Sequence, residues 1–173
     1  MGEWRAMPAE LATERIHLGA WRAADVDDLM ALVNERDTRT AAAPRNGRPN
    51  RGEVGERVKR RQSELADSGI ALYAMRVDNE FAGYCGLVVG RASLDEPEIA
   101  YELPLRFWGR GLATEAAHAV VAAAARTGRT RLWATVRTWN DASFRVLDNV
   151  GFERSGRVTT DEFGELVWCT RRL

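Results

Sequence analysis

The chain contains few of the residues that build metal centres, disulfide frameworks or membrane spans. Its 173 residues include two cysteines and two histidines, and their spacing matches no metal-ligand or disulfide pattern. No apolar run approaches the roughly 20 residues that span a bilayer, and residues 1–14 lack the apolar stretch of a signal peptide. We therefore expect a cytoplasmic protein with no metal and no membrane partner. The four residues concerned are His17, Cys85, His118 and Cys169.

Charge is balanced overall but unevenly distributed. The 25 basic and 25 acidic residues cancel, so no global field recruits nucleic acid, and we expect no nucleic-acid partner. Arginine carries almost all the positive charge, because Lys59 is the single lysine. Basic residues gather between positions 36 and 61. The loop over residues 36–52 either attracts an acidic peptide or an anionic small molecule, or it is an ordinary solvated loop.

The pattern of apolar residues predicts one α+β domain covering residues 1–173. Alternating segments predict about seven strands, and helical spacing with capping residues such as Asp25 predicts about four helices. Most strand neighbours are close in sequence, which favours a mixed, mostly antiparallel sheet. We expect a loop over 36–52, helices from Asp25 and over 53–67, 111–126 and 141–150, and strands over 15–21, 71–77, 81–90, 98–103, 131–138, 152–160 and 166–172.

A glycine-containing turn joins one predicted strand to one predicted helix, over residues 106–111. Gly109 and Gly111 allow a tight turn and a close backbone approach. The start of the following helix presents free N–H groups and a positive dipole end, which favour an anion. Arg110 and Arg106 add cationic character. Taken alone, this pattern fits either a phosphate site or a simple strand-to-helix turn.

Further segments accompany this turn in a fixed order. Glu98 stands on the strand before the turn. About thirty residues after the turn, a second helix begins at Asn140-Asp141-Ala142-Ser143 and ends at Asn149-Val150-Gly151-Phe152. This ordered set resembles the GNAT superfamily of N-acetyltransferases, and in particular the branch of ribosomal-protein N-terminal (Rim-type) acetyltransferases. The resemblance extends over nearly the whole chain, through segments 11–18, 81–87, 98–103 and 107–116.

The resemblance implies that acetyl-coenzyme A (acetyl-CoA) binds in a V-shaped gap between two splayed parallel strands, 98–103 and 131–138. The pantetheine arm would bond to the main chain at Leu103 and Leu105 and to Asn140. A backbone N–H near Leu103 would stabilise the oxyanion. The pyrophosphate would rest on the amides of the turn and the first helical residues, which are Gly109, Arg110, Gly111, Leu112, Ala113 and Thr114.

The resemblance also implies catalytic roles. Glu98 would accept the proton of the amine through water, with Glu102, on the same strand face, as the reserve candidate. Ser143 would donate a proton to the leaving thiolate and contact the cofactor. The alternatives are an ion pair for Glu98, a surface charge for Glu102, helix capping for Asn140 and an ordinary first-turn hydroxyl for Ser143.

The resemblance leaves the acceptor open. It implies direct attack by a primary amine, either a protein N-terminal α-amine or a small molecule such as an amino acid, polyamine or antibiotic. A non-catalytic acyl-CoA-binding regulatory module is the third possibility, against which Glu98, Asn140 and Ser143 argue. Trp21 and Trp139 are candidates for lining the acceptor pocket. A homodimer is conceivable through the last strands, where residues such as Val167 and Trp168 would pair across a sheet edge.

Overall fold

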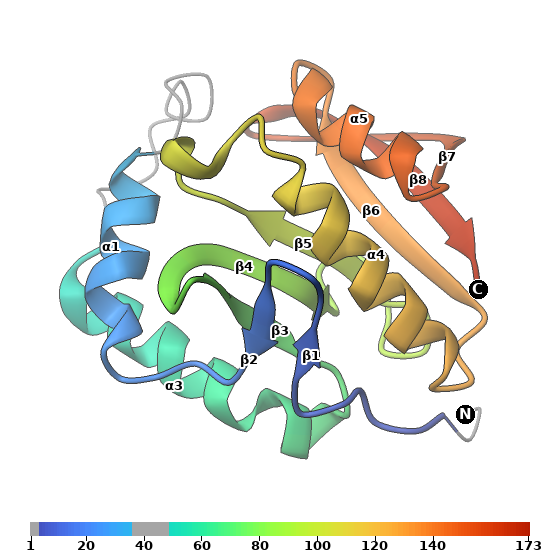
Figure 1. Ribbon diagram of the computed structural model, residues 1–173. Coiled ribbons are helices and arrows are strands. Elements are labelled where there is room, and N and C mark those ends of the chain that lie inside the picture. Colours follow the sequence, from blue (N-terminus) through green and yellow to red (C-terminus); the bar gives the residue numbers. More distant parts are fainter. Residues whose placement is uncertain (1–3, 36–48) are drawn as a thin grey trace.

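The computed structural model describes residues 4–35 and 49–173, which form an eight-stranded sheet packed against helices (Figure 1). The strand order is β1-β2-β3-β4-β5-β6-β8-β7, and every neighbouring pair is antiparallel except β5 and β6. The strands are β1 (Leu11–Ala12), β2 (His17–Gly19), β3 (Leu72–Val77), β4 (Glu80–Val88), β5 (Glu98–Glu102), β6 (Arg131–Arg137), β7 (Glu153–Asp161) and β8 (Gly164–Arg172). The helices of these residues are α1 (Asp25–Glu35), α3 (Arg51–Ser68), the short 3-10 helix η1 (Leu105–Phe107), α4 (Leu112–Ala125) and α5 (Asp141–Asn149).

This architecture confirms the predicted α+β class. One short strand, β1, was not anticipated, and it pairs with β2. Most of the loop expected over 36–52 lies outside the described residues, while its last residues belong to α3, which Asn50 caps. No helix in the described ranges is sufficiently long and apolar to cross a membrane.

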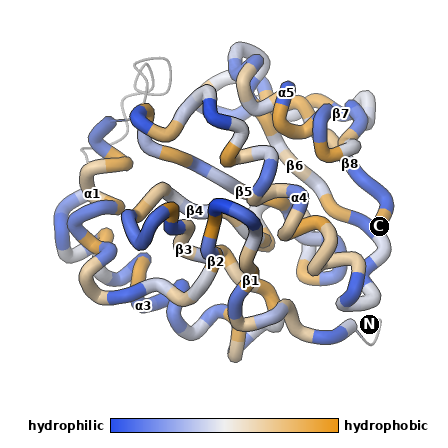
Figure 2. The backbone as a smooth tube through the Cα atoms, in the orientation of Figure 1, coloured by the Kyte–Doolittle hydropathy of each residue, from blue (hydrophilic) through white to orange (hydrophobic). Residues whose placement is uncertain are grey.

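The sheet is covered on both faces, and β3 shows this directly because all six of its residues are buried. Tyr73 and Met75 face a large core shared with α4 and α5, whereas Ala74 belongs to a second core built from α1 and α3. Small residues along α4, including the fully buried Ala116 and Ala117, let this helix approach the sheet closely. Figure 2 shows the contrast between α4, which is mostly apolar, and α3, which is mostly hydrophilic.

Local turn chemistry sets two of the element boundaries. The β3–β4 hairpin turns at Asp78 and Asn79, whose φ values of 51° and 65° fit the left-handed turn that such hairpins favour. Helix α3 ends at Gly69, also left-handed with φ 72°, and its N–H bonds to the Leu65 carbonyl. Both boundaries match the predicted turn and helix stop.

A buried ion pair fixes the start of α1 on the sheet. The Asp25 carboxylate accepts from the Arg76 guanidinium at 2.5 Å and from the Arg22 N–H at 2.7 Å. Both side chains of the pair are about 95% shielded, with 5% and 4% exposure. Asp25 was predicted to cap this helix, but it lies inside α1 and bonds back to the Arg22 N–H, and its main contact anchors α1 to β3.

The parallel strands β5 and β6 touch only at their beginnings. Glu98 faces Trp133 in the single register pair between them, and the Trp133 N–H donates to the Pro97 carbonyl at 3.0 Å. Beyond this point β5 stays paired with β4, and β6 stays paired with β8 along its whole length. The two strands therefore diverge, which confirms the predicted splayed pair.

The expected dimer contact through the last strand is wrong. Strand β8 lies between β6 and β7 and is not an edge. Trp168 is 2% exposed, with its ring packed edge-on against Trp133. The edge on this side is β7, whose outward residues are mostly polar and exposed. Val167 and Trp168 cannot pair across an edge.

Candidate active site in the gap between strands β5 and β6

The turn before α4 has the geometry of an anion site. Gly109 and Gly111 adopt φ values of 70° and 75°, a region that side chains other than glycine disfavour. Gly111 is the N-cap of α4, and no side chain of the described residues caps the first turn. The leading N–H groups of this 14-residue helix are therefore available to a phosphate, and the helix dipole favours its charge.

Three residues that were not among the predicted site residues hold this turn in place. The Arg15 guanidinium donates to the Arg110 carbonyl at 2.9 Å and pairs with Glu115 at 2.6 Å. The Thr13 hydroxyl donates to the same carboxylate at 2.5 Å. Burial alone would raise the pKa of Glu115, but the hydrogen bonds from Thr13 and Arg15 outweigh burial and lower it. Glu115 thus stays ionised and fastens the β1–β2 segment to the turn.

The two arginines of the turn point to different partners. Arg106 pairs with Glu80 of β4 at 2.8 Å and donates to the Phe81 carbonyl at 3.2 Å. Arg110 lies against the Phe107 ring, 5.5 Å from its centroid, and has no carboxylate partner among the described residues. Only Arg110 therefore remains as a cation for a phosphate group, while Arg106 ties the turn to the sheet.

Two backbone groups expected to bind the pantetheine arm already have internal partners. The Leu103 carbonyl accepts from the Trp108 indole at 2.7 Å. The Leu105 N–H donates to the Glu35 carboxylate at the end of α1, at 3.1 Å. A ligand strand added here must use the remaining main-chain groups of the segment or displace Glu35, which is exposed.

Glu98 lies at the closed end of the gap and is enclosed. It is 5% exposed, and its two oxygens accept from the Arg91 N–H and from the Thr135 hydroxyl, the latter at 2.7 Å. Gly90 lets the β4–β5 loop close over the carboxylate, because a Cβ there would collide with Glu98. The carboxylate thus joins β5, β6 and this loop at the point where the parallel strands meet.

Glu102 lies on the same face of β5, at the open end of the gap. It is half-buried, faces Tyr84 in the β4–β5 register and accepts from the Tyr84 hydroxyl at 2.6 Å. The structure therefore brings both predicted carboxylates to one strand face, but it gives them different surroundings.

Asn140 and Ser143 lie at the start of α5, near the other face of β5. The Asn140 side-chain oxygen accepts from the Ser143 N–H at 3.1 Å, so Asn140 caps α5. The NH₂ group of the same amide remains available as a donor. Tyr101 reaches this turn from β5. Its hydroxyl donates to the Ser143 carbonyl at 3.1 Å and accepts from the Ser143 hydroxyl at 3.3 Å.

Tyr101 is a site residue that sequence reasoning missed. Its hydroxyl comes from β5, the strand before the turn, and meets Ser143 at the start of α5. Burial raises the pKa of Tyr101 well above its ordinary value, and the hydrogen bond with Ser143 only partly opposes this. The phenol therefore stays protonated and able to donate. The only signal in the sequence was its position between Glu98 and Glu102.

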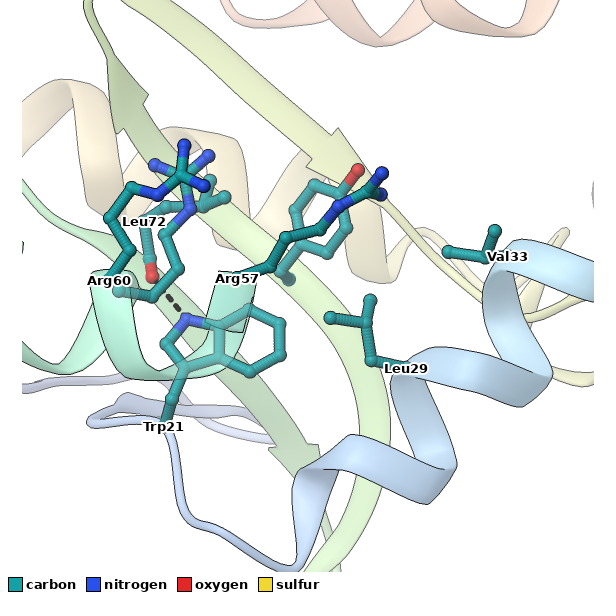
Figure 3. A pocket seen from close by; sticks show the side chains of 8 residues that line it. Trp21, Leu29, Val33, Arg57, Arg60 and Leu72 are labelled. Carbon is teal, nitrogen blue, oxygen red and sulfur yellow. Dashed lines mark hydrogen bonds between the residues drawn. The ribbon is translucent and has the colours of Figure 1, made fainter. Parts of the chain in front are cut away.

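A hollow of about 120 Å³ opens between α1, α3 and β4 (Figure 3). The Trp21 indole forms its floor, with its N–H bonded to the Leu72 carbonyl at 2.6 Å and its ring 6.2 Å from that of Tyr84. Trp21 thus lines a pocket beside the Tyr84–Glu102 pair, whereas Trp139 does not. The lining residues are Trp21, Leu29, Val33, Arg57, Arg60, Arg61, Leu72 and Tyr84.

Histidine and cysteine take no part in the site. His17 lies near Glu10 on the surface, and His118 is exposed on α4. Cys85 and Cys169 are free and buried. Within residues 4–35 and 49–173, no group of three or more His, Cys, Asp or Glu side chains is arranged to hold a metal ion.

Solved structures share this fold over almost the whole chain. A putative GnaT-family acetyltransferase from Bordetella pertussis superposes with a TM-score of 0.79 at 24% identity, covering 95% of this chain and 99% of its own. The Microcin C7 self-immunity acetyltransferase MccE, solved with acetyl-CoA and AMP, gives 0.78 at 15% identity, with 93% and 94% covered. RimL, a ribosomal L7/L12 α-N-protein acetyltransferase solved with coenzyme A, gives 0.77 at 18% identity, with 96% and 97% covered.

Family membership comes from the sequence match. A comparison with curated proteins found no match. The family model described as acetyltransferase (GNAT) domain matches residues 15–153, which include the turn, both carboxylates and the start of α5. The chain therefore belongs to the acetyltransferase (GNAT) domain family and is an acyltransferase that uses acetyl-CoA as donor.

Proposed function

We propose that this protein transfers the acetyl group of acetyl-CoA to a primary amine that is bound on the α1/α3 face of β5. The observation that carries this proposal is the splay of β5 from β6. The splay opens a gap that has an uncapped helix end on one side and the Glu98–Glu102 face on the other. The two substrates would meet in the gap from opposite faces of the sheet.

The donor side of the gap suits a pyrophosphate. The amides from Gly109 to Thr114 and the Arg110 guanidinium would hold the phosphates, while Arg15 and Glu115 keep the turn in shape. The amide NH₂ of Asn140 would donate to the pantetheine arm. Acetyl-CoA, when bound, supplies an activated thioester, and the chain supplies orientation and proton transfer.

We assign proton removal from the amine to Glu102, directly or through one water. An amine must lose a proton to attack, and a carboxylate within reach of the acceptor performs this task. Glu102 is half-buried and touches Tyr84, which lines the hollow. Glu98 is enclosed by Arg91 and Thr135 at the closed end, so its carboxylate holds the strand junction together.

Ser143 would protonate the departing thiolate, with Tyr101 holding its hydroxyl. Ser143 stands in the first turn of α5, where the α5 dipole favours negative charge nearby. The Tyr101 hydroxyl contacts both polar atoms of Ser143, namely its carbonyl and its hydroxyl.

A thiol-release assay over a panel of primary amines and N-terminal peptides tests the proposal. The peptides come first because of the Rim-type resemblance, and small amines come second because the hollow is small, at about 120 Å³. Glu102→Gln should lower kcat about a hundredfold with unchanged acetyl-CoA affinity. Glu98→Gln should mainly lower thermal stability. Tight acetyl-CoA binding with no turnover of any amine would overturn the proposal and favour a regulatory module.

A further inference from the structure

The hollow beside Tyr84 has a cationic wall. Arg57, Arg60 and Arg61 all line it, and their spacing of three and four residues places them on one face of α3. None of the described residues that line it is acidic. Figure 3 shows Arg57 and Arg60 extending from α3 beside Trp21, with Leu29 and Val33 of α1 on the opposite side.

Two guanidinium groups of this wall lack a carboxylate within salt-bridge distance. Three of the five basic residues of α3 have such partners: Arg51 pairs with Asp27, Lys59 with Glu56, and Arg61 with Glu64. The side chains of Arg57 and Arg60 are exposed and form no hydrogen bond or ion pair with any residue of the described ranges. Arg60 acts on a carboxylate only at longer range, where it helps Lys59 to lower the pKa of Glu56.

Tyr84 connects the hollow to the reaction gap. The hollow also has an apolar part, formed by Trp21, Leu29 and Leu72. The Tyr84 hydroxyl donates to Glu102 at 2.6 Å. A molecule lying in the hollow would thus have cations on one wall and a carboxylate just beyond Tyr84.

We propose that the hollow binds an anionic group, a carboxylate or a phosphate, carried by the amine acceptor itself. Arg57 and Arg60 bind this group through charge-assisted hydrogen bonds, which guanidinium forms well with either anion. Trp21 supports the apolar segment of the acceptor, and its amine lies toward Glu102. This inference rests on the proposed function, because the anion is recognised as part of the acceptor.

Matched pairs of amines test the inference. Each pair consists of an amine with a carboxylate and the same amine with a carboxamide, or of a phosphate and its hydroxyl counterpart. Each pair is tested as a free small molecule and as the N-terminal residue of a peptide, for example Asp against Asn. Comparing these two forms shows whether the anionic acceptor is a small molecule or a peptide. We expect wild-type kcat/KM to be about tenfold higher for the anionic member of each pair. A tenfold ratio is roughly the contribution of one charge-assisted hydrogen bond.

The double variant Arg57→Gln/Arg60→Gln should lose this tenfold preference, measured as the ratio of kcat/KM for the two members of a pair, and should keep its acetyl-CoA affinity. The matched control is Lys59→Gln, which removes one charge from the same helix outside the hollow and should keep the preference. Charge reversal by Arg57→Glu/Arg60→Glu should make cationic amines the better substrates. Circular dichroism checks that each variant is folded.

The outcomes separate the two proposals. Equal kcat/KM for anionic and neutral amines in the wild type, or a preference that survives in the double variant, would overturn the inference and leave acetyl transfer intact. Failure to acetylate any amine, with acetyl-CoA still bound, would overturn the proposed function. A preference lost equally in Lys59→Gln would show a general charge effect and would also overturn the assignment to the hollow.

Discussion

Replacing Tyr101 by phenylalanine isolates the contribution of one hydroxyl to the proposed proton donor. The ring stays in the core with Ile99 and Leu103, so packing is preserved. What is lost is the hydrogen bond to the Ser143 carbonyl at 3.1 Å and the one from the Ser143 hydroxyl at 3.3 Å. The Ser143 hydroxyl is then free to rotate away from the leaving sulfur.

The expected size of the effect follows from these distances. Both contacts are longer than the usual O–H···O distance of about 2.7–2.8 Å, so each belongs to the weaker part of the range of about 0.5–1.5 kcal/mol per hydrogen bond. We expect Tyr101→Phe to cost about 1 kcal/mol in stability. A similar loss in the transition state corresponds to about a fivefold decrease in kcat. The KM for acetyl-CoA should change less than about twofold, because the hydroxyl bears on the leaving group.

A double-mutant cycle with Ser143→Ala provides the test, with kcat from thiol release and stability from urea unfolding. Ser143→Ala alone should lower kcat by about a hundredfold, the lower end of proton-donor effects, and acetyl-CoA binding much less. If Tyr101 acts through Ser143, Tyr101→Phe has no further effect on kcat in the Ser143→Ala background. The same fivefold loss in both backgrounds would refute the positioning role, and unchanged kcat in the single variant would refute any role.

Three further predictions concern cofactor binding and stability. Gly111→Val forces a β-branched residue to φ 75° and should weaken acetyl-CoA binding at least about tenfold by calorimetry; Gly55→Ala, in open space on α3, is the control, and unchanged affinity would contradict the turn as the phosphate site. Asp25→Ala leaves Arg76 buried without its carboxylate and should lower the free energy of unfolding by about 3–5 kcal/mol, so a loss under about 1 kcal/mol in urea would contradict the anchor. Burial raises the pKa of the Cys85 thiol, so the unfolded chain ionises first and stability should fall above about pH 8.5, by up to about 1.4 kcal/mol per pH unit. Cys85→Ala should remove that part of the slope between pH 8.5 and the tyrosine range near pH 10, and an identical slope would show that the thiol does not titrate differently on folding.

Local sequence signals were sufficient for most of the fold. The hairpin at Asp78 and Asn79, the end of α3 at Gly69 and the strand before the turn depend on neighbours within a few residues, and the structure has them where the patterns predicted. The two-residue strand β1 was not predicted because it is too short to show alternation. The error about Val167 and Trp168 arose because strand order is a nonlocal property that alternation does not contain.

Only part of the candidate site could be predicted from the sequence, because local patterns do not contain contacts between distant residues. The turn at Gly109 and Gly111 is local, and its conformation follows from residue type. By contrast, the partner of Arg106, the enclosure of Glu98 and the contact between Tyr101 and Ser143 join residues 26, 37 and 42 positions apart. No periodicity in the chain encodes such pairs, although each changes the chemistry that can be assigned to a side chain.

Local sequence signals describe the proposed donor side of the site, whereas contacts between distant side chains describe the proposed acceptor side. The donor side is built largely from main chain, through glycine φ values and an uncapped helix start, and such features are common to a fold. The proposed acceptor side is built from side chains, with Arg57 and Arg60 on α3, Trp21 before α1 and Tyr84 on β4. Under this proposal, substitutions there change the surface that the acceptor meets without disturbing the turn. The family match therefore identifies the donor, while the proposal assigns the choice of amine to the side chains of α1, α3 and β4.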